Sequence, residues 1–241
     1  MQSVSVCLCT YNGERFLPDL LPSVLGQLSS QDELVIVDDS STDGTLAYLK
    51  GLRDPRIRLY ENTSNLGPQQ SFKRAIELSQ GDVIFLCDQD DVWLPHKVST
   101  CVKALQGSSH LLLSHGVYYV DENLKLLKDH PQMAPEKNKT FFKILVKNHF
   151  TGATMCFKKE LKPHILPYLG DVPMHDWWMA LVASLRGGIL VLKEPLIYYR
   201  RHPQTFTQLQ HQKKISLRAI FMRLKMIRVL GKLAHLVLVF L

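Results

Sequence analysis

Short apolar runs alternate with amphipathic segments through the first half of the chain. The runs with the length and composition of buried strands occupy residues 4–9, 34–37, 57–60 and 83–86. The segments with apolar residues at helical spacing occupy residues 16–28, 45–52 and 69–78. Pro68 stands where a first helical residue would favour proline. This alternation predicts an α/β fold with a mainly parallel central sheet flanked by helices.

The second half of the chain has a less regular pattern. Strand-like apolar runs occupy residues 110–120, 152–157, 189–192 and 196–199. Helices are predicted over residues 141–147 and 177–185. The polar stretch at 121–139 contains two prolines and predicts a loop. We therefore expect a regular first half followed by a more variable second half.

Polar side chains follow every predicted strand of the first half. The residues after the four strands are Thr10, Tyr11 and Asn12, then Asp38 and Asp39, then residues 62–67, and finally residues 88–91. The carboxyl ends of parallel strands lie at one edge of a sheet, and ligands bind in the crevice outside that edge. The pattern therefore predicts a binding site where these groups converge.

Three carboxylates, those of Asp88, Asp90 and Asp91, stand together after the fourth predicted strand. They would repel one another at the end of a buried strand, and a hard divalent cation such as Mg²⁺ or Mn²⁺ would relieve that repulsion. Mg²⁺ sites often combine one or two carboxylates with substrate phosphates. The alternative is an acidic, solvated turn, since short acidic clusters are common in loops. The polar residues after the other strands weigh against that alternative.

The glycines form neither of two common nucleotide-binding motifs. No GxGxxG sequence follows the first predicted strand, and neither GxxxxGKS nor GxxxxGKT occurs in the chain. The sequence therefore disfavours a classical NAD site and a P-loop nucleoside triphosphatase.

The composition is that of an ordinary globular protein, with 46% hydrophobic and 21% charged residues in a chain of 241. The five cysteines are scattered without a CxxC pair, so we expect buried structural thiols in a reducing, cytosolic compartment. The first residues lack the basic and apolar regions of a signal peptide. No apolar run approaches the ~20 residues that a membrane span needs.

The net charge of +7 is concentrated near the carboxyl terminus, where nine lysines and arginines follow residue 199. Such an excess indicates an anionic partner, either lipid headgroups or nucleic acid. Residues 206–241 mix these cations with apolar residues and predict a basic, amphipathic helical tail. Two interpretations stay open. The tail lies on an anionic membrane surface, or it packs on the preceding domain with its lysines in solvent.

Four of these segments occur in the order and spacing of a known family. They are residues 10–13, the run 35–45 around Asp38 and Asp39, residues 65–67, and the acidic cluster 88–91. Together they resemble inverting family 2 glycosyltransferases of the GT-A fold. The sequences at 175–178 and 199–202 are similar, more narrowly, to those of bacterial rhamnosyltransferase-type members.

The resemblance implies a Rossmann-like GT-A catalytic domain at residues 1–205, followed by the tail at 206–241. Residues 1–105 would form its nucleotide-binding half and residues 106–205 its acceptor-binding half. The implied donor is a UDP-sugar or dTDP-sugar, bound with Mg²⁺ or Mn²⁺. The residues implied in donor binding are Thr10, Tyr11, Asn12, Asp39, Gly67, Asp88 and Arg200. The implied metal ligands are Asp90, Asp88 and His202.

The resemblance also implies that Asp176 is the general base that deprotonates the acceptor hydroxyl. Asp176 stands near the start of a predicted helix, where the helix dipole favours its ionised form. Two alternatives come from the sequence itself. Asp176 is an ordinary helix N-cap, and His202 is a surface residue after two arginines.

The expected function is therefore metal-dependent, inverting transfer of a sugar to an acceptor hydroxyl in cell-surface polysaccharide synthesis, with rhamnose as the candidate sugar. We expect a saccharide or lipid-linked saccharide acceptor, no nucleic acid partner, and a cytoplasmic protein that is peripheral on the membrane. One alternative is a sugar-nucleotide nucleotidyltransferase, but residues 10–15 do not resemble its phosphate loop. The other is a non-enzymatic anion-binding module, whose binding would be steeply salt-dependent.

Overall fold

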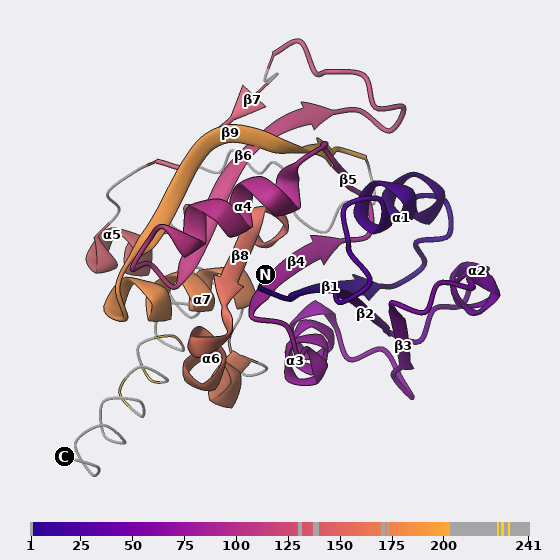
Figure 1. Cartoon of the computed structure of the whole chain (residues 1–241), viewed down its shortest axis with the longest axis horizontal. Helices are drawn as coiled ribbons and strands as arrows, with labels where there is room; N and C mark the ends of the chain where they lie inside the picture. The colour runs from indigo at the N-terminus through magenta and orange to yellow at the C-terminus, as the bar shows by residue number, and fades with distance from the viewer. Residues whose placement is uncertain are drawn as a thin grey trace.

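The computed structural model describes residues 2–129, 132–136, 140–169, 172 and 174–202, together with Met226, Arg228 and Gly231. One curved sheet runs through these residues, with helices on both of its faces (Figure 1). The expected α/β fold with a central sheet is therefore confirmed.

The first four strands form the parallel part of the sheet. They are β1 (Val4–Thr10), β2 (Glu33–Asp38), β3 (Ile57–Glu61) and β4 (Val83–Asp88), in the order β3-β2-β1-β4. All four were predicted, with small differences at their ends. Helices cover both faces of these strands, which is why their sequences are almost continuously apolar instead of alternating.

The sheet continues beyond β4 as a mixed part. Its strands are β8 (Met155–Lys158), β6 (Leu112–Val120), β9 (Ile189–Arg200) and β5 (Val92–Trp93), with β7 (Gln132–Met133) paired to β6. β8 is antiparallel to both β4 and β6, whereas β9 is parallel to β6. Both expected halves of the catalytic domain thus contribute strands to one sheet. The short strand β7 lies inside the segment predicted as a loop.

β9 is one strand where the sequence predicted two. It passes through Pro195, and its pairing with β6 is irregular on both sides of Gly116. A Cβ atom on Gly116 would lie 2.7 Å from the Lys193 carbonyl oxygen and 3.1 Å from that of Glu194. Glycine therefore lets β9 approach β6 closely at the point where proline interrupts the regular ladder.

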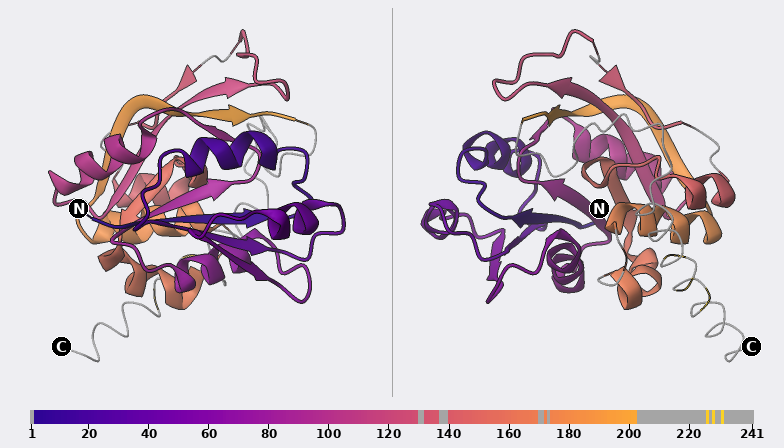
Figure 2. Two further views of the ribbon diagram at one scale, coloured as in Figure 1. Left: turned by 45° about the vertical axis from the view of Figure 1, so that its right-hand side comes forward. Right: turned by 180° about the vertical axis from the view of Figure 1, so that it is seen from behind.

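Helices cover the sheet on its two faces (Figure 1, Figure 2). On one face lie α1 (Leu17–Leu25), α2 (Thr45–Gly51) and α4 (Lys97–Gln106). On the other face lie α3 (Pro68–Leu78), α5 (Phe141–Val146), α6 (Lys162–Leu169) and α7 (His175–Leu185). The sequence predicted neither α4 nor α6. Pro68 is the first residue of α3, as expected.

Two tryptophans fix the helix that carries the expected base. Trp177 and Trp178 of α7 are buried in the core beneath the sheet. The indole N–H of Trp177 donates to the carbonyl oxygen of Ile144 in α5. The indole N–H of Trp178 donates to that of Ile165 in α6 at 3.0 Å. Burial of one large apolar side chain stabilises a fold by about 1.5–3 kcal/mol. These residues therefore hold the start of α7 against two neighbouring helices.

The cysteines have the structural role that the sequence predicted. All five are free thiols, and Cys7, Cys87, Cys101 and Cys156 are buried. Cys9 is half-buried. Burial raises the pKa of the Cys7 thiol far above its usual value, so the thiol stays protonated.

Most of the predicted tail at 206–241 lies outside the described residues. Met226 is fully buried within the same core cluster as α7, while Arg228 and Gly231 are exposed. At Met226, therefore, the chain packs into the core cluster that contains α7. Within the part of the chain that the structure describes, none of the helices has the length and apolar character to cross a membrane.

Candidate active site

The acidic loop (residues 88–91) lies beside the end of β9, although the two are more than 100 residues apart in sequence. The backbone N–H of Arg200 donates to Asp91 Oδ1 at 3.1 Å, and His202 Nε2 lies 3.0 Å from Asp90 Oδ2. The His202 side chain is only 6% exposed and its ring lies 4.6 Å from that of Phe16, centroid to centroid. The alternative of an exposed surface histidine is therefore wrong.

Arg200 connects the acidic loop to two other segments. Its Nε donates to the Asp90 carbonyl oxygen at 2.8 Å, and its Nη1 donates to the Glu122 carbonyl oxygen at 2.8 Å. Its Nη2 pairs with Asp19 Oδ2 at 2.9 Å, and the guanidinium carbon lies 5.0 Å from the centre of the Phe16 ring. The side chain is almost fully buried. Arg200 therefore holds the acidic loop, and the expected contact of Arg200 with the donor stays a prediction.

Burial makes the negative charge of the acidic loop costly. It raises the pKa of Asp88 to about 7, with further contributions from the charges of Asp90 and Asp176. Burial likewise raises the pKa of Asp91, with the charges of Asp90 and Asp88 adding to the effect. Asp91 Oδ2 is buried without a hydrogen-bond partner among the described residues. The loop therefore concentrates poorly compensated negative charge, as a site for a cation would.

A divalent cation fits the donor set of this loop only in part. Among the described residues, no group of three or more His, Cys, Asp or Glu side chains is arranged to hold a metal ion. Asp90 and His202 nevertheless present an oxygen and a nitrogen 3.0 Å apart, and Asp88 is the last residue of β4, two positions before Asp90. Mg²⁺ commonly takes one or two carboxylates and completes its shell with water and substrate phosphates. The residues present fit an ion held partly by a bound diphosphate.

Asp39 lies at the end of β2 and holds the loop that precedes α3. Its Oδ1 accepts from Asn62 Nδ2 at 2.7 Å and from the Leu66 N–H at 2.9 Å, and its Oδ2 accepts from the Gly67 N–H at 2.8 Å. Gly67 has φ +83°, a conformation that favours glycine. A carboxylate offers about four acceptor positions, so Asp39 retains one for a ligand.

The three residues after β1 have different environments. The Thr10 side chain is buried and donates to Asp38 Oδ1 at 2.8 Å. Asn12 Oδ1 accepts from the Thr42 N–H at 2.8 Å. Tyr11 is 45% exposed and presents its ring at this edge of the sheet. Tyr11 is thus the residue of this group best placed to contact a ligand, while Thr10 and Asn12 support the loops around it.

Gln89 is a site residue that the sequence analysis missed. Its Oε1 accepts from the Tyr11 N–H at 2.8 Å, and its Nε2 donates to the Tyr11 carbonyl oxygen at 3.0 Å. A Cβ atom on Gly13 would lie 2.4 Å from Gln89 Oε1, so glycine makes room for this contact. In the sequence, only the position of Gln89 between Asp88 and Asp90 pointed to it. Its partner is the Tyr11 backbone, and no side-chain pattern predicts such a contact.

Asp176 is buried near the first turn of α7, with Met174 at the N-cap position. The alternative of an ordinary N-cap residue is therefore wrong. Asp176 Oδ1 accepts from the Trp177 N–H at 2.6 Å. Burial raises the pKa of Asp176, against smaller opposite effects that include hydrogen bonds from the Asn148 side chain and the Gly152 N–H. Its charge in turn raises the pKa of Asp88, so the two carboxylates lie near one another across the site.

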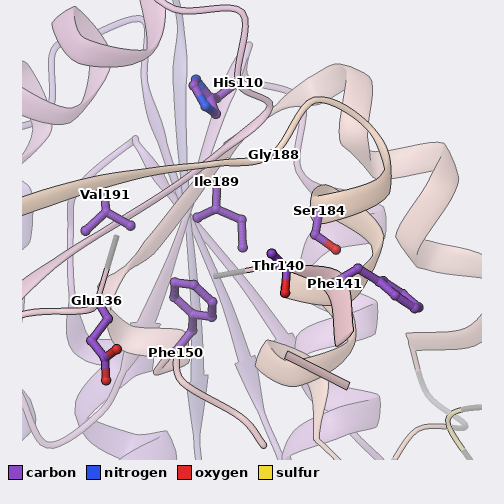
Figure 3. Close-up of a pocket in the computed structure, with 9 residues that line it drawn as sticks. All are labelled: His110, Glu136, Thr140, Phe141, Phe150, Ser184, Gly188, Ile189 and Val191. Carbon is purple, nitrogen blue, oxygen red and sulfur yellow. The ribbon is translucent and has the colours of Figure 1, made fainter. Parts of the chain in front are cut away.

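Figure 3 shows a pocket of about 210 Å³ whose lining includes none of these aspartates. It is lined by His110, Glu136, Thr140, Phe141, Phe150, Ser184, Gly188, Ile189 and Val191. His110 precedes β6 and Gly188 precedes β9, so the pocket lies at the amino ends of these parallel strands. It is therefore distinct from the candidate active site at the opposite strand ends.

Comparison with known proteins assigns the chain to a family of transferases. The model of the family "Glycosyl transferase family 2" matches residues 5–162. That is more than half of the chain, so the protein belongs to glycosyltransferase family 2. The expected family and its GT-A-like fold are thereby confirmed.

Relatives with known sequence are similar over most of the chain. A glycosyltransferase of Nostoc sp. is 28% identical over 214 residues, which cover 83% of this chain and 65% of the relative. The dTDP-rhamnosyl transferase RfbG of Shigella flexneri is 26% identical over 237 residues, covering 92% of this chain and 79% of that protein. The chain spans about three fifths of the length of several relatives that it matches.

A similar fold occurs in the solved structure of S. aureus TarS 1–349 in complex with UDP-GlcNAc. Its TM-score is 0.65 and its sequence identity 18%, and the match covers 84% of this chain and 59% of TarS 1–349. At this level of identity the likeness shows the fold alone.

We expect the contribution of Asp88 to the free energy of unfolding of the metal-free protein to fall as the pH rises from about 4 to 7. The pKa of Asp88 is about 7 in the folded state and near 3.8 in an unfolded chain, so the folded state retains a proton that the unfolded state loses in this window. Asp88→Asn should reduce the slope, by at most about 1.4 kcal/mol per pH unit. Urea unfolding in EDTA at several pH values measures it.

Asp82→Asn is the matched control for this experiment. Asp82 lies just before the opposite end of β4, and hydrogen bonds from Ser3 lower its pKa, so it titrates below the window. Its variant should keep the wild-type slope. A slope in Asp88→Asn equal to that of the wild type would contradict the assignment of this proton to Asp88.

Proposed function

We propose that this protein transfers a sugar from a nucleoside-diphosphate sugar to an acceptor hydroxyl, with inversion at the anomeric carbon. The observation that carries this proposal is the convergence of the acidic loop, His202 and Asp176 at one edge of the sheet, in a member of family 2. Breaking the bond between sugar and diphosphate places negative charge on the leaving group, and the site must stabilise that charge.

Asp90 and His202 are the groups that would hold a divalent cation, with Asp88 beside them. When bound, Mg²⁺ or Mn²⁺ neutralises charge on the departing diphosphate as a Lewis acid. Arg200 keeps Asp90 in place through the Asp90 carbonyl oxygen. Asp91 accepts from the Arg200 backbone and thereby fixes the end of β9. The protein's contribution is thus a rigid, negatively charged frame for the metal and the diphosphate.

Asp176 would accept the proton of the acceptor hydroxyl. Its burial raises its pKa, which makes its carboxylate a stronger base than an exposed aspartate. The hydrogen bonds from Trp177, Asn148 and Gly152 oppose that rise and orient the carboxylate. A well-placed general base typically contributes about 10²–10⁴-fold to the rate.

Tyr11 and Asp39 would recognise the base of the nucleotide. The exposed ring of Tyr11 can stack on a pyrimidine, and the remaining acceptor position of Asp39 can take the ring N–H. Uracil and thymine both carry that N–H, so the proposal includes UDP-sugars and dTDP-sugars. The similarity to a protein named dTDP-rhamnosyl transferase supports dTDP-rhamnose as the first candidate donor.

No specific observation supports either alternative function, the sugar-nucleotide nucleotidyltransferase or the anion-binding module. The family match is to glycosyltransferases, and the loop after β1 is built around side-chain to backbone contacts instead of a phosphate-binding glycine loop. A saccharide or lipid-linked saccharide in surface polysaccharide synthesis remains the proposed acceptor.

Metal-dependent nucleotide binding is the first test of the proposal. Calorimetry with UDP, dTDP and GDP, each with and without Mn²⁺, should show that a pyrimidine nucleotide binds more tightly with the ion. Asp90→Asn should weaken binding in Mn²⁺ by about 10-fold or more, because one carboxylate ligand is lost. Asp82→Asn should leave it unchanged. The absence of any metal-dependent nucleotide binding to the wild type would overturn the proposal.

Asp176→Asn separates binding from chemistry. The variant keeps the shape of the side chain and should bind the nucleotide as the wild type does, while transfer falls about 10²–10⁴-fold because the base is gone. The measurement is the rate of sugar transfer, or of donor hydrolysis when no acceptor is supplied. Turnover close to that of the wild type would remove Asp176 from this role.

The proposal includes a peripheral position on an anionic membrane, through the basic residues of the tail. Flotation with vesicles containing anionic lipid should recover the protein at low salt and release it at high salt. Vesicles of zwitterionic lipid are the control and should not recover it. Failure to float with anionic vesicles at low salt would contradict the membrane contact without affecting the site.

A further inference from the structure

We propose that Lys97 is a positioning residue for the transfer reaction. Its ammonium group holds the turn η1 (Gly152–Thr154), and through that turn the carboxylate of Asp176, at a fixed place opposite the acidic loop. This inference rests on the proposed function, and it concerns a residue that touches neither the donor nor the acceptor.

Lys97 is the first residue of α4 and is fully buried. Its Nζ donates to the Ala153 carbonyl oxygen at 3.0 Å and lies 3.8 Å from the centre of the Trp93 ring. Removing an ammonium group from water is unfavourable unless nearby groups compensate it. Lys97 gives the Ala153 carbonyl oxygen a buried hydrogen-bond donor, which an apolar residue at this position could not supply.

The turn that Lys97 holds packs directly against the start of α7. The Gly152 N–H lies close enough to the Asp176 carboxylate to lower the pKa of Asp176. A Cβ atom on Gly152 would lie 2.7 Å from His175 Nε2, and the His175 ring stacks on Phe72 with the centroids 4.4 Å apart. Movement of this turn would therefore be transmitted to His175 and Asp176.

The other side of Lys97 faces the acidic loop. Trp93, on which the ammonium lies, belongs to β5, which pairs with β9 just before Arg200. The positive charge of Lys97 lowers the pKa of Asp88 and of Asp91, against the larger effect of burial. The buried ammonium of Lys97 thus contacts both β5, through Trp93, and the turn η1, through Ala153.

This arrangement predicts a specific kinetic consequence. Displacement of a catalytic group by about 1 Å can reduce a rate by ~10²-fold while leaving substrate binding intact. Without the ammonium, the Ala153 carbonyl oxygen loses its buried donor. The turn then keeps only its remaining contacts, such as that of the Thr154 hydroxyl with Ser114 at 2.8 Å, and its position is less tightly held. Loss of Lys97 should therefore reduce turnover more than it reduces affinity for the nucleotide.

The test compares Lys97→Met with the wild type in the full chain. We expect kcat for donor hydrolysis or transfer to fall about 10- to 100-fold, while the Kd for UDP or dTDP in Mn²⁺ changes by less than about threefold. Lys97→Arg keeps the charge and the donor and should recover part of the rate. Unchanged kcat in Lys97→Met, or no recovery in a folded Lys97→Arg, would overturn the proposal.

Lys162→Met is the matched control. Lys162 Nζ also donates to backbone carbonyl oxygens, those of Glu77 at 3.0 Å and Ser79 at 2.8 Å, but at the junction of α3 and α6. Its loss should lower the Tm without lowering kcat. A loss of kcat as large as that in Lys97→Met would mean that general destabilisation explains both variants, and would overturn the positioning role.

Gly152→Ala tests the same turn from its other side and keeps Lys97 in place, so it decides the question if Lys97→Met does not fold. Its added methyl group must displace His175, so we expect the same signature of lowered kcat with retained nucleotide binding. Wild-type kcat in this variant would overturn the inference. If the wild type itself bound no nucleotide and transferred no sugar, the proposed function would be wrong. If the wild type were active and only the variants lacked the expected effect, the positioning role of Lys97 alone would be wrong.

Discussion

The structure depends on keeping three carboxylates together at the end of one buried strand. Burial and mutual repulsion raise the pKa of Asp88 and Asp91, so the acidic loop would not hold its shape without partners. Those partners come from the end of β9, where Arg200 donates from its backbone and its guanidinium and His202 lies against Asp90. The pairing of β9 with β6 therefore does more than extend the sheet, because it brings Arg200 and His202 to the acidic loop.

Side chains that bond to backbone groups join the loops around this cluster. Gln89 bonds to both backbone groups of Tyr11, and Asp39 holds the loop before α3. Each contact joins segments from different strands, so this side of the site is held in place by the protein itself. Preorganisation of this kind matters because a site that must rearrange spends binding energy on ordering its own groups.

The sequence predicted the parallel strands well because they are buried on both faces, which leaves long apolar runs bounded by polar loops. It did not predict α4, whose first residue, Lys97, is charged and yet fully buried. It divided β9 in two because Pro195 usually marks a strand end. The resemblance implied that Arg200 contacts the donor, but it gave no sign that the Arg200 guanidinium bonds to protein oxygens from three other segments.

By itself, the sequence determined the order of the strands along the chain, the edge at which polar groups gather, and the identity of the acidic loop. These follow from local hydrophobic periodicity and from the fact that parallel strands end at a common edge. Only the tertiary structure decided which groups meet there: His202 with Asp90, Gln89 with Tyr11, and Lys97 with the turn beside Asp176. Such pairings join residues far apart in sequence, and no local pattern encodes them because they depend on how the strands pair and cross.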